Sequence, residues 1–309
     1  AVNIANIFVD KGLKVVETKG KLSELNKTYK TNFGATDKNI PLAVLIDGNS
    51  ASASEIVAGF IQDVDRGIIL GQKSFGKGLV QNIIPLSYNT SLKVTTAKYY
   101  IPSGRCIQAI DYSTKVNGKA THYSDSLKQS FKTKNGRTVY DAGGILPDIE
   151  IQPDSLSEIA ISLLLKNHIF NFVTDYVRNH ASIPDATLFE FSDDEYKQFV
   201  AYLSDKEYDY KTSSELKLDE LIEAMKQDKY YDISAEEITK LQNKIGHNKQ
   251  RDLELFQSEL KQIIGNEIVS RYYYQKGRIV YDLKYDKEVD KAIELLLNPA
   301  EYNKILNTK

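Results

Sequence analysis

The sequence of 309 residues is poor in the residue types that several classes of site require. It contains one cysteine, Cys106, which excludes a framework of internal disulfide bonds. The four histidines lie far apart in the sequence and show no spacing typical of metal ligands (His122, His168, His180 and His247). We therefore expect neither a zinc site nor any other cofactor.

Long apolar runs and an excess of one charge are also missing. No apolar run approaches the ~20 residues of a membrane-spanning helix, so no membrane span is expected in this chain. With 40 basic and 42 acidic residues the net charge is −2, which argues against nucleic acid as a partner. The chain has neither an initiating methionine nor a signal peptide, and we expect a mature or shortened product.

The most informative stretch runs from residue 41 to residue 81. Residues 42–46 form a short apolar run rich in β-branched residues, which predicts a buried strand. Gly48 and Asn49 then indicate a sharp turn, and Glu55 opens an apolar helical pattern after a run of small residues. A strand, a tight turn and a helix start place serine hydroxyls beside unpaired backbone N–H groups. A nucleophile and part of an oxyanion hole can form there.

A second apolar run, residues 68–70, leads to a loop at residues 74–78 that holds Lys77 between two glycines. This loop is not a P-loop, because Gly78 stands where a serine or threonine would hold Mg²⁺. A lysine can instead act as the base for a serine nucleophile if burial among apolar groups removes its charge. The alternative is a helix start rich in small residues and a solvated lysine, and the residues alone favour that alternative.

Several motifs resemble those of the C-terminal processing peptidases, also called tail-specific proteases. In order, they are S-A-S-A-S-E at 50–55, Q-D at 62–63, F-G-K-G-L-V-Q at 75–81, Y-Y-I-P-S-G-R at 99–105 and G-G-I-L-P-D at 143–148. The resemblance covers residues 1 to about 152. It implies an α/β core of the ClpP/crotonase type in a serine endopeptidase that cleaves protein substrates near their C-termini. It also implies a periplasmic or otherwise extracytoplasmic location.

The resemblance implies a nucleophile and a base. Ser52, the middle serine of its motif, is the implied nucleophile, although the sequence by itself leaves Ser50, Ser52 and Ser54 open. Lys77 follows 25 positions later, which matches the spacing of the family, and is the implied general base. Gln81 is the implied group that helps to position this lysine.

Two supporting residues follow from the same resemblance. The backbone N–H of Ala53 is one implied oxyanion donor, and Asp63 is a supporting residue in some members of the family. A plain helix-end carboxylate near Arg66 is an equally good interpretation of Asp63. A glycine-rich turn with the second oxyanion donor and a PDZ module are expected upstream of Ala1. Because loss of one donor typically costs ~10²–10³ in turnover, we expect this chain alone to be weakly active or inactive.

Helical patterns replace the strands beyond Pro153, which predicts a protease core over 1–152 and a helical C-terminal domain over 153–309. Three S-x-x-E boxes indicate helix starts, at Ser155, Ser192 and Ser234. The first of these helices is expected over about 156–178. The role of the helical region is open, and pairing of identical chains through it is one expectation.

Two other functions remain alternatives. In the first, the chain is a non-catalytic binding or assembly module. The exposed tyrosines expected at 272–274 would suit an interface, although such a run is more often ordinary packing. In the second, the same fold binds acyl-CoA. Lys77 argues against that function, because thioester chemistry on this fold does not need a serine–lysine pair.

Overall fold

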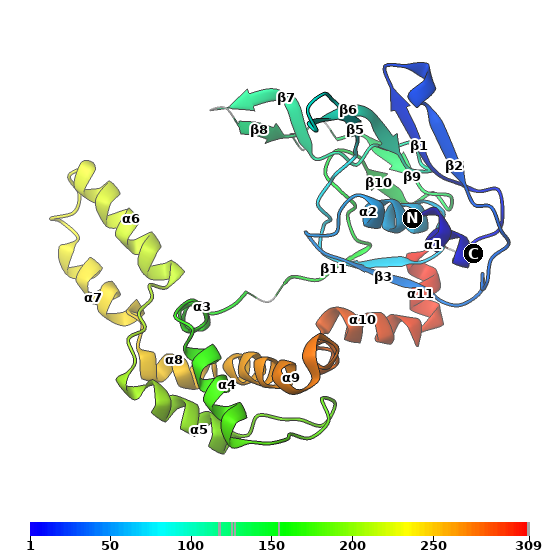
Figure 1. Ribbon diagram of the computed structural model, residues 1–309. Helices are drawn as coiled ribbons and strands as arrows, with labels where there is room; N and C mark the ends of the chain where they lie inside the picture. Colours follow the sequence, from blue (N-terminus) through cyan, green and yellow to red (C-terminus); the bar gives the residue numbers. More distant parts are fainter. Residues whose placement is uncertain (117–118, 125, 127, 154, 308–309) are drawn as a thin grey trace. The chain divides into compact units, whose positions relative to one another are not determined.

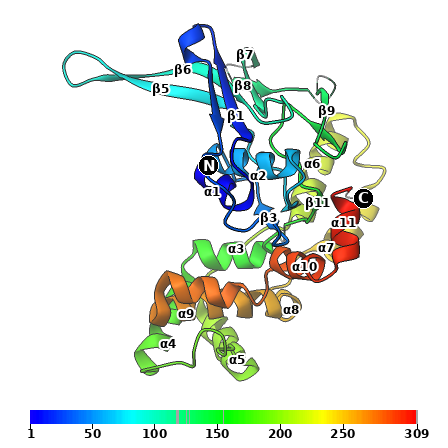
Figure 2. The same cartoon turned by 90° about the vertical axis from the view of Figure 1, so that its right-hand side faces the viewer.

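The computed structural model describes residues 1–116, 119–124, 126, 128–153 and 155–307. They form two compact units, which are described separately here. The first unit comprises Ala1–Pro153 together with Lys287–Lys309, and the second comprises Asp154–Asp286. Figures 1 and 2 show strands in the first unit and helices in the second.

The first unit contains an antiparallel sheet and a parallel sheet. The antiparallel sheet has the order β2 (Lys27–Lys30), β1 (Lys14–Gly20), β6 (Ser91–Tyr100) and β5 (Leu79–Pro85). The parallel sheet has the order β11 (Ile149–Glu150), β4 (Ile68–Gly71) and β3 (Ala43–Ile46). Two short ladders pair β7 (Ile110–Val116) with β8 (Lys119–His122), and β9 (Ser130–Lys132) with β10 (Thr138–Tyr140). Its helical segments are α1 (Val2–Phe8), η1 (Ser23–Leu25), α2 (Ala53–Asp63), α10 (Lys287–Leu296) and α11 (Pro299–Ile305).

The strand, helix and strand expected between residues 42 and 70 are present as β3, α2 and β4. β3 and β4 pair in parallel, so α2 is the crossover of a β–α–β unit. Phe60 and Ile61 of α2 are fully buried against Ile69 of β4 in the largest apolar cluster of this unit. Because parallel strands end at the same edge of a sheet, the turns after β3 and after β4 lie at one edge.

The C-terminal helices α10 and α11 pack on the first unit, which differs from the single helical domain expected over 153–309. Leu295 and Tyr302 bury apolar surface against Ile68 and Leu70 of β4. The Tyr302 hydroxyl also donates to the carbonyl of Leu42 and accepts from its N–H, both at 2.9 Å. An amphipathic pattern identifies these helices, but it does not say which sheet their apolar face covers.

The second unit is helical. Its segments are α3 (Glu158–Leu165), α4 (His168–Asn179), α5 (Asp193–Tyr202), η3 (Leu203–Asp205), α6 (Ser213–Gln227), α7 (Ala235–Ile245), α8 (Lys249–Leu255) and α9 (Gln257–Asp282). The single helix expected over 156–178 is divided into α3 and α4. Asn167, at the break, has a left-handed backbone with φ 59°, a conformation that asparagine adopts more readily than most residues.

The helix starts agree with the expected boxes only in part. Ser192 and Glu195 form the expected capping box of α5. The side chain of Ser157, not of Ser155, caps α3, and Ser234 precedes α7 without a side-chain capping bond. The residue type therefore predicts a helix start better than it predicts the capping residue itself.

Two of the three tyrosines at 272–274 form hydrogen bonds within the second unit. The hydroxyls of Tyr272 and Tyr273 donate to the carbonyls of His180 and Ile183. Tyr274 has a positive φ of 54° where α9 bends, and its side chain is 78% exposed. Two of the three tyrosines thus serve internal packing.

Candidate active site

The turn after β3 presents three serines in different environments. Ser50 Oγ donates to the Asp47 carboxylate at 2.9 Å, as part of a tight turn. Ser54 lies inside α2 and is exposed. Ser52 precedes the first residue of α2 and has φ 59° and ψ −113°. A non-glycine residue in this conformation costs of order 1–3 kcal/mol and is often found at functional sites. Of the three serines that the sequence left open, Ser52 is thus the one with a positive φ.

The lysine loop after β4 is held against that turn and against the segment 107–109. The N–H of Phe75 donates to the Ser50 carbonyl at 3.0 Å. Gly76 has φ 85°, and a Cβ atom there would lie 2.4 Å from that of Ala109. The Ala109 N–H donates to the Gly76 carbonyl at 2.8 Å. A glycine is therefore needed for both the conformation and the close approach of this loop.

The carboxylate of Glu55 joins the serine turn to the lysine loop. Glu55 is fully buried in the first turn of α2. One of its oxygens accepts from Ser74 Oγ and from the Gly76 N–H, both at 2.6 Å. The other accepts from the N–H groups of Ser52 at 2.8 Å and Lys77 at 2.9 Å. Four donors thus satisfy one buried carboxylate, which offsets the cost of removing its charge from water.

These bonds limit the distance between the two implied catalytic residues. Because the Ser52 and Lys77 nitrogens bond to the same oxygen, they lie no more than 5.7 Å apart, the sum of the two bond lengths. The structure therefore brings their backbones together although they are 25 positions apart in sequence.

The role of Glu55 in this arrangement was missed by the sequence analysis. The signal is nevertheless present, because Ser52-x-x-Glu55 is the same S-x-x-E pattern that indicates helix starts in the second half of the chain.

The side chains of Lys77 and Gln81 are exposed, which differs from the water-poor environment that a neutral lysine needs. Gln81 lies on β5, just after an irregularity in its pairing with β6. Its amide donates to Thr95 Oγ1 at 3.4 Å. The described residues therefore place Lys77 beside Ser52 without covering its amine.

Ala53 is the first residue of α2. The N–H of a first helical residue has no partner within its own helix, and the helix dipole favours negative charge at that end. Ala53 thus carries one of the N–H groups that lack a partner within α2.

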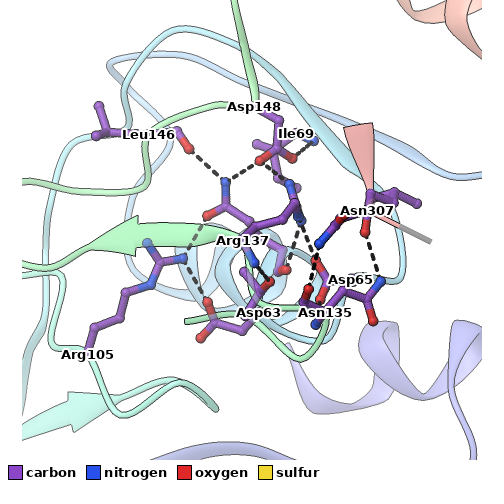
Figure 3. Close-up of polar contacts among 12 residues, drawn as sticks. Asp63, Asp65, Ile69, Arg105, Asn135, Arg137, Leu146, Asp148 and Asn307 are labelled. Atoms are coloured by element: carbon purple, nitrogen blue, oxygen red, sulfur yellow. Dashed lines mark hydrogen bonds and ion pairs between the residues drawn. The ribbon is translucent and has the colours of Figure 1, made fainter. Parts of the chain in front are cut away.

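Asp63 lies at the other end of α2, which at ~1.5 Å per residue is ~16 Å from Ser52 along the helix axis. Its carboxylate pairs with Arg105 at 2.9 Å (Figure 3). It also accepts from the Ser103 N–H at 2.9 Å. Burial raises the pKa of Asp63 and lowers the pKa of Arg105, and the ion pair opposes both shifts. The partner is not Arg66, whose guanidinium donates to backbone carbonyls, one of them that of Phe8.

The same polar network contains the last residues of two further motifs, Arg105 of Y-Y-I-P-S-G-R and Asp148 of G-G-I-L-P-D. Asp148 of G-G-I-L-P-D accepts from the N–H of Ile69 in β4 and pairs with Arg137. Arg137 also pairs with Asp65 at 2.6 Å. Figure 3 shows these groups around the end of α2. Asp63 therefore belongs to a network that joins α2, β4 and the 102–105 turn, which is a structural role.

Among the described residues, no helix is long and apolar enough to cross a bilayer. Within the same residues there is no group of three or more His, Cys, Asp or Glu side chains arranged to hold a metal ion.

Two protein families match different parts of the chain. Residues 1–116 match peptidase family S41, and residues 159–296 match the family described as "Probable PDZ-protease, C-terminal helical domain". The first match contains both the serine turn and the lysine loop, and the second covers most of the helical unit.

Individual proteins are similar over the first part of the chain. A carboxy-terminal-processing protease of Bartonella bacilliformis is 47% identical over 116 residues, which are 38% of this chain and 26% of that protein. A chloroplastic C-terminal processing peptidase of Tetradesmus obliquus is 37% identical over 117 residues, 37% of this chain and 24% of that protein. The chain thus matches about a quarter of the length of these relatives. A solved photosystem II D1 C-terminal processing protease is 28% identical, with a TM-score of 0.35 over 50% of this chain and 31% of that one.

Proposed function

We propose, from the premise that this chain belongs to the C-terminal processing peptidase family, that it carries the nucleophile and the base of a serine endopeptidase that cleaves proteins near their C-termini. One observation carries the proposal. The backbone nitrogens of Ser52 and Lys77 bond to one oxygen of the buried Glu55 carboxylate. With their backbone nitrogens held this close, the side chains of Ser52 and Lys77 are long enough to meet.

In the proposed reaction Ser52 Oγ attacks the carbonyl carbon of the scissile peptide bond while Lys77 Nζ takes its proton. The backbone N–H of Ala53 donates to the oxyanion that forms. Lys77 then gives the proton to the leaving amine, and an acyl-enzyme remains on Ser52. Water attacks this ester with Lys77 again as the base, which frees the new carboxylate and restores the serine.

The exposure of Lys77 leads to an expectation about activity. A lysine acts as a base only after it loses its proton, and surrounding water favours the charged form. A bound substrate, or a further part of the protein, must therefore cover the amine. We expect weak or no proteolysis by this chain alone, in which Ala53 is the one assigned oxyanion donor.

Four finer points belong to the proposal. Gln81 positions Lys77 once the amine is covered, and Asp63 acts only through the stability of α2. The protein works in the periplasm or in another extracytoplasmic compartment, as its resemblance to the family implies. Identical chains pair through the helical unit.

A serine-reactive fluorophosphonate probe with a peptide portion, which can cover the Lys77 amine as a substrate would, tests the proposed dyad. We expect labelling at Ser52 that is abolished in Ser52→Ala and slowed at least ~10²-fold in Lys77→Ala, the usual contribution of a general base. Lys73→Ala is the matched control, because Lys73 is an exposed lysine of the same loop region. It should change the rate less than about twofold.

Four outcomes would contradict parts of the proposal. Labelling at Ser50 or Ser54, or labelling of Ser52 that Lys77→Ala does not slow, would exclude the dyad. Labelling of no serine would favour the non-catalytic binding or assembly module. Robust cleavage of an unfolded protein by this chain, lost in Ser52→Ala, would contradict the expected weak activity.

A further inference from the structure

A buried tyrosine hydroxyl lies between the carbonyl groups of the two residues of the proposed dyad. Tyr99 is near the end of β6, and its side chain is 3% exposed within the apolar cluster of the first unit. Its hydroxyl donates to the Lys77 carbonyl at 2.6 Å and lies 3.4 Å from the Ser52 carbonyl. The Tyr99 N–H also donates to the Gly78 carbonyl at 3.0 Å. Both its backbone and its side chain thus hold the lysine loop.

The hydroxyl remains a donor over the working pH range. Burial, and next the neighbouring Glu55 carboxylate, raise the pKa of Tyr99 well above its usual value. Phenolate formation is therefore disfavoured, and the proton stays available for the Lys77 carbonyl. The shorter distance identifies that carbonyl as the main acceptor, and the Ser52 carbonyl as the weaker one.

Tyr99 and Glu55 bond to the peptide groups that precede and follow the same two residues. The Glu55 carboxylate accepts from the N–H groups of Ser52 and Lys77, whereas the Tyr99 hydroxyl faces the carbonyl groups of these two residues. The Ser52 carbonyl is also held by the Ile56 N–H at 3.0 Å, so it is mainly Lys77 that Glu55 alone would leave free to turn about its bonded nitrogen. A second anchor at the carbonyl removes that freedom.

We propose that Tyr99 is a positioning residue that fixes the separation and orientation of Ser52 and Lys77. This inference rests on the proposed function for its effect on the reaction, but its structural part does not depend on activity. A displacement of about 1 Å between a nucleophile and its base can cost ~10²-fold in rate. A hydroxyl that touches neither substrate nor reacting atoms can therefore still control the chemical step.

The neighbouring residue supplies a matched control. Tyr100 follows Tyr99 on β6, so its side chain points to the other face of the sheet. Its ring lies under the ammonium of Lys19 at 4.8 Å. Tyr100→Phe thus removes a hydroxyl from the same strand without removing an anchor of the dyad, while Tyr99→Phe removes the anchor and keeps the buried ring.

The first measurement is the labelling of Ser52 by the fluorophosphonate probe, with the maximal rate and the half-saturating probe concentration determined separately. Tyr99→Phe should lower the maximal rate about tenfold and leave the half-saturating concentration unchanged. Tyr100→Phe should stay within about twofold of the unchanged chain. If Tyr99→Phe only lowered stability and did not displace Ser52 or Lys77, the fraction of labelled protein would fall and the maximal rate would not change.

The second measurement is amide hydrogen exchange at residues 50–55 and 74–78, which needs no activity. Tyr99→Phe should speed exchange in both segments, and Tyr100→Phe in neither. If no serine is labelled in the unchanged chain, the proposed function fails, and hydrogen exchange still decides whether Tyr99 anchors the loops. Equal exchange in the two variants would overturn the inference, and so would equal maximal labelling rates.

Discussion

Different kinds of interaction stabilise the interiors of the two units. Among the described residues, all but three of the buried polar or charged side chains lie in the first unit, the exceptions being Ser162, Asp252 and Asn266. The ring–ring contacts between described aromatic side chains lie in the second unit, for example Phe172 with Phe199 at 5.0 Å. The first unit thus combines apolar clusters with buried polar groups, most of them hydrogen-bonded, whereas the second depends mainly on apolar and aromatic packing.

This difference indicates where each unit tolerates change. A buried carboxylate such as Glu55 has fixed donors and fixed directions, so it specifies one arrangement of the chain around it. An apolar cluster accepts substitutions of similar volume with small losses of stability. We therefore expect that substitutions in the first unit affect geometry and reactivity together, and that substitutions in the second affect stability alone.

The largest expected effect comes from Glu55→Gln. The substitution removes the charge and turns an amide NH₂ toward donors, so we expect a loss of about 3 kcal/mol in the free energy of unfolding. We also expect a fall of ~10²-fold in the labelling rate of Ser52. Denaturant unfolding and probe kinetics measure the two quantities. Asp252→Asn is the matched change of a buried carboxylate in the second unit, and it should leave labelling unchanged. If Glu55→Gln and Asp252→Asn slowed the labelling of Ser52 equally, the expected difference between the two units would be wrong.

Leu295→Ala in α10 is expected to lower stability by a similar amount but to leave the labelling of Ser52 unchanged, so its total effect is smaller. Leu295 is fully buried against β4, and a leucine-to-alanine change in a core costs about 3 kcal/mol. Hydrogen exchange should rise at residues 43–46 and 68–71 and stay unchanged at 159–173. Ile293→Ala, on the same helix but 50% exposed, is the control. A rise confined to 154–286 would mean that α10 belongs to the helical unit, as the sequence predicted.

The smallest effect concerns acid stability of the second unit. Burial alone would raise the pKa of Glu215, but hydrogen bonds from the N–H of Thr212 and from His247 outweigh it and lower this pKa from 4.5 to about 2. The carboxylate therefore contributes stability above pH ~4.5, and this contribution is lost as the pH falls toward ~2. Glu215→Gln should cost about 1 kcal/mol near neutral pH, after allowance for partial exposure, and this difference should shrink in acid.

Urea midpoints measured across this pH range check the prediction. Glu223→Gln, an exposed residue of the same helix, is the control and should show no such pH dependence. If the urea midpoints of the Glu215 variant and the unchanged chain differ by the same amount at every pH, the charge of Glu215 does not contribute to stability.

Strongly patterned elements could be predicted from the sequence, and weakly patterned ones could not. β3 and β4 are short apolar runs, and α2 follows small residues and a helical pattern. β2 was missed because its four side chains are all exposed, so no apolar alternation marks it. β5 was missed because its apolar residues come in adjacent pairs, Leu79-Val80 and Ile83-Ile84, so no strict alternation marks it.

The candidate site shows the same division. The motifs around Ser52 and Lys77 resemble those of the family, and the structure places the two backbones together. Glu55 and Tyr99 also stand within motifs of the family, but the sequence indicated no role for either. Their roles depend on which donors and carbonyls lie beside them, and those partners are 22 positions away in the contacts with Lys77.

The sequence by itself determined the local elements, because backbone preference and apolar periodicity depend on residues within a few positions of each other. It was enough to predict a strand, a turn rich in serine, a helix and a lysine between glycines. Only the tertiary structure decided which groups meet, including Leu42 with Tyr302 across 260 positions. Such pairs form because buried donors and acceptors must be satisfied by whatever the fold brings next to them, and no local pattern specifies that partner.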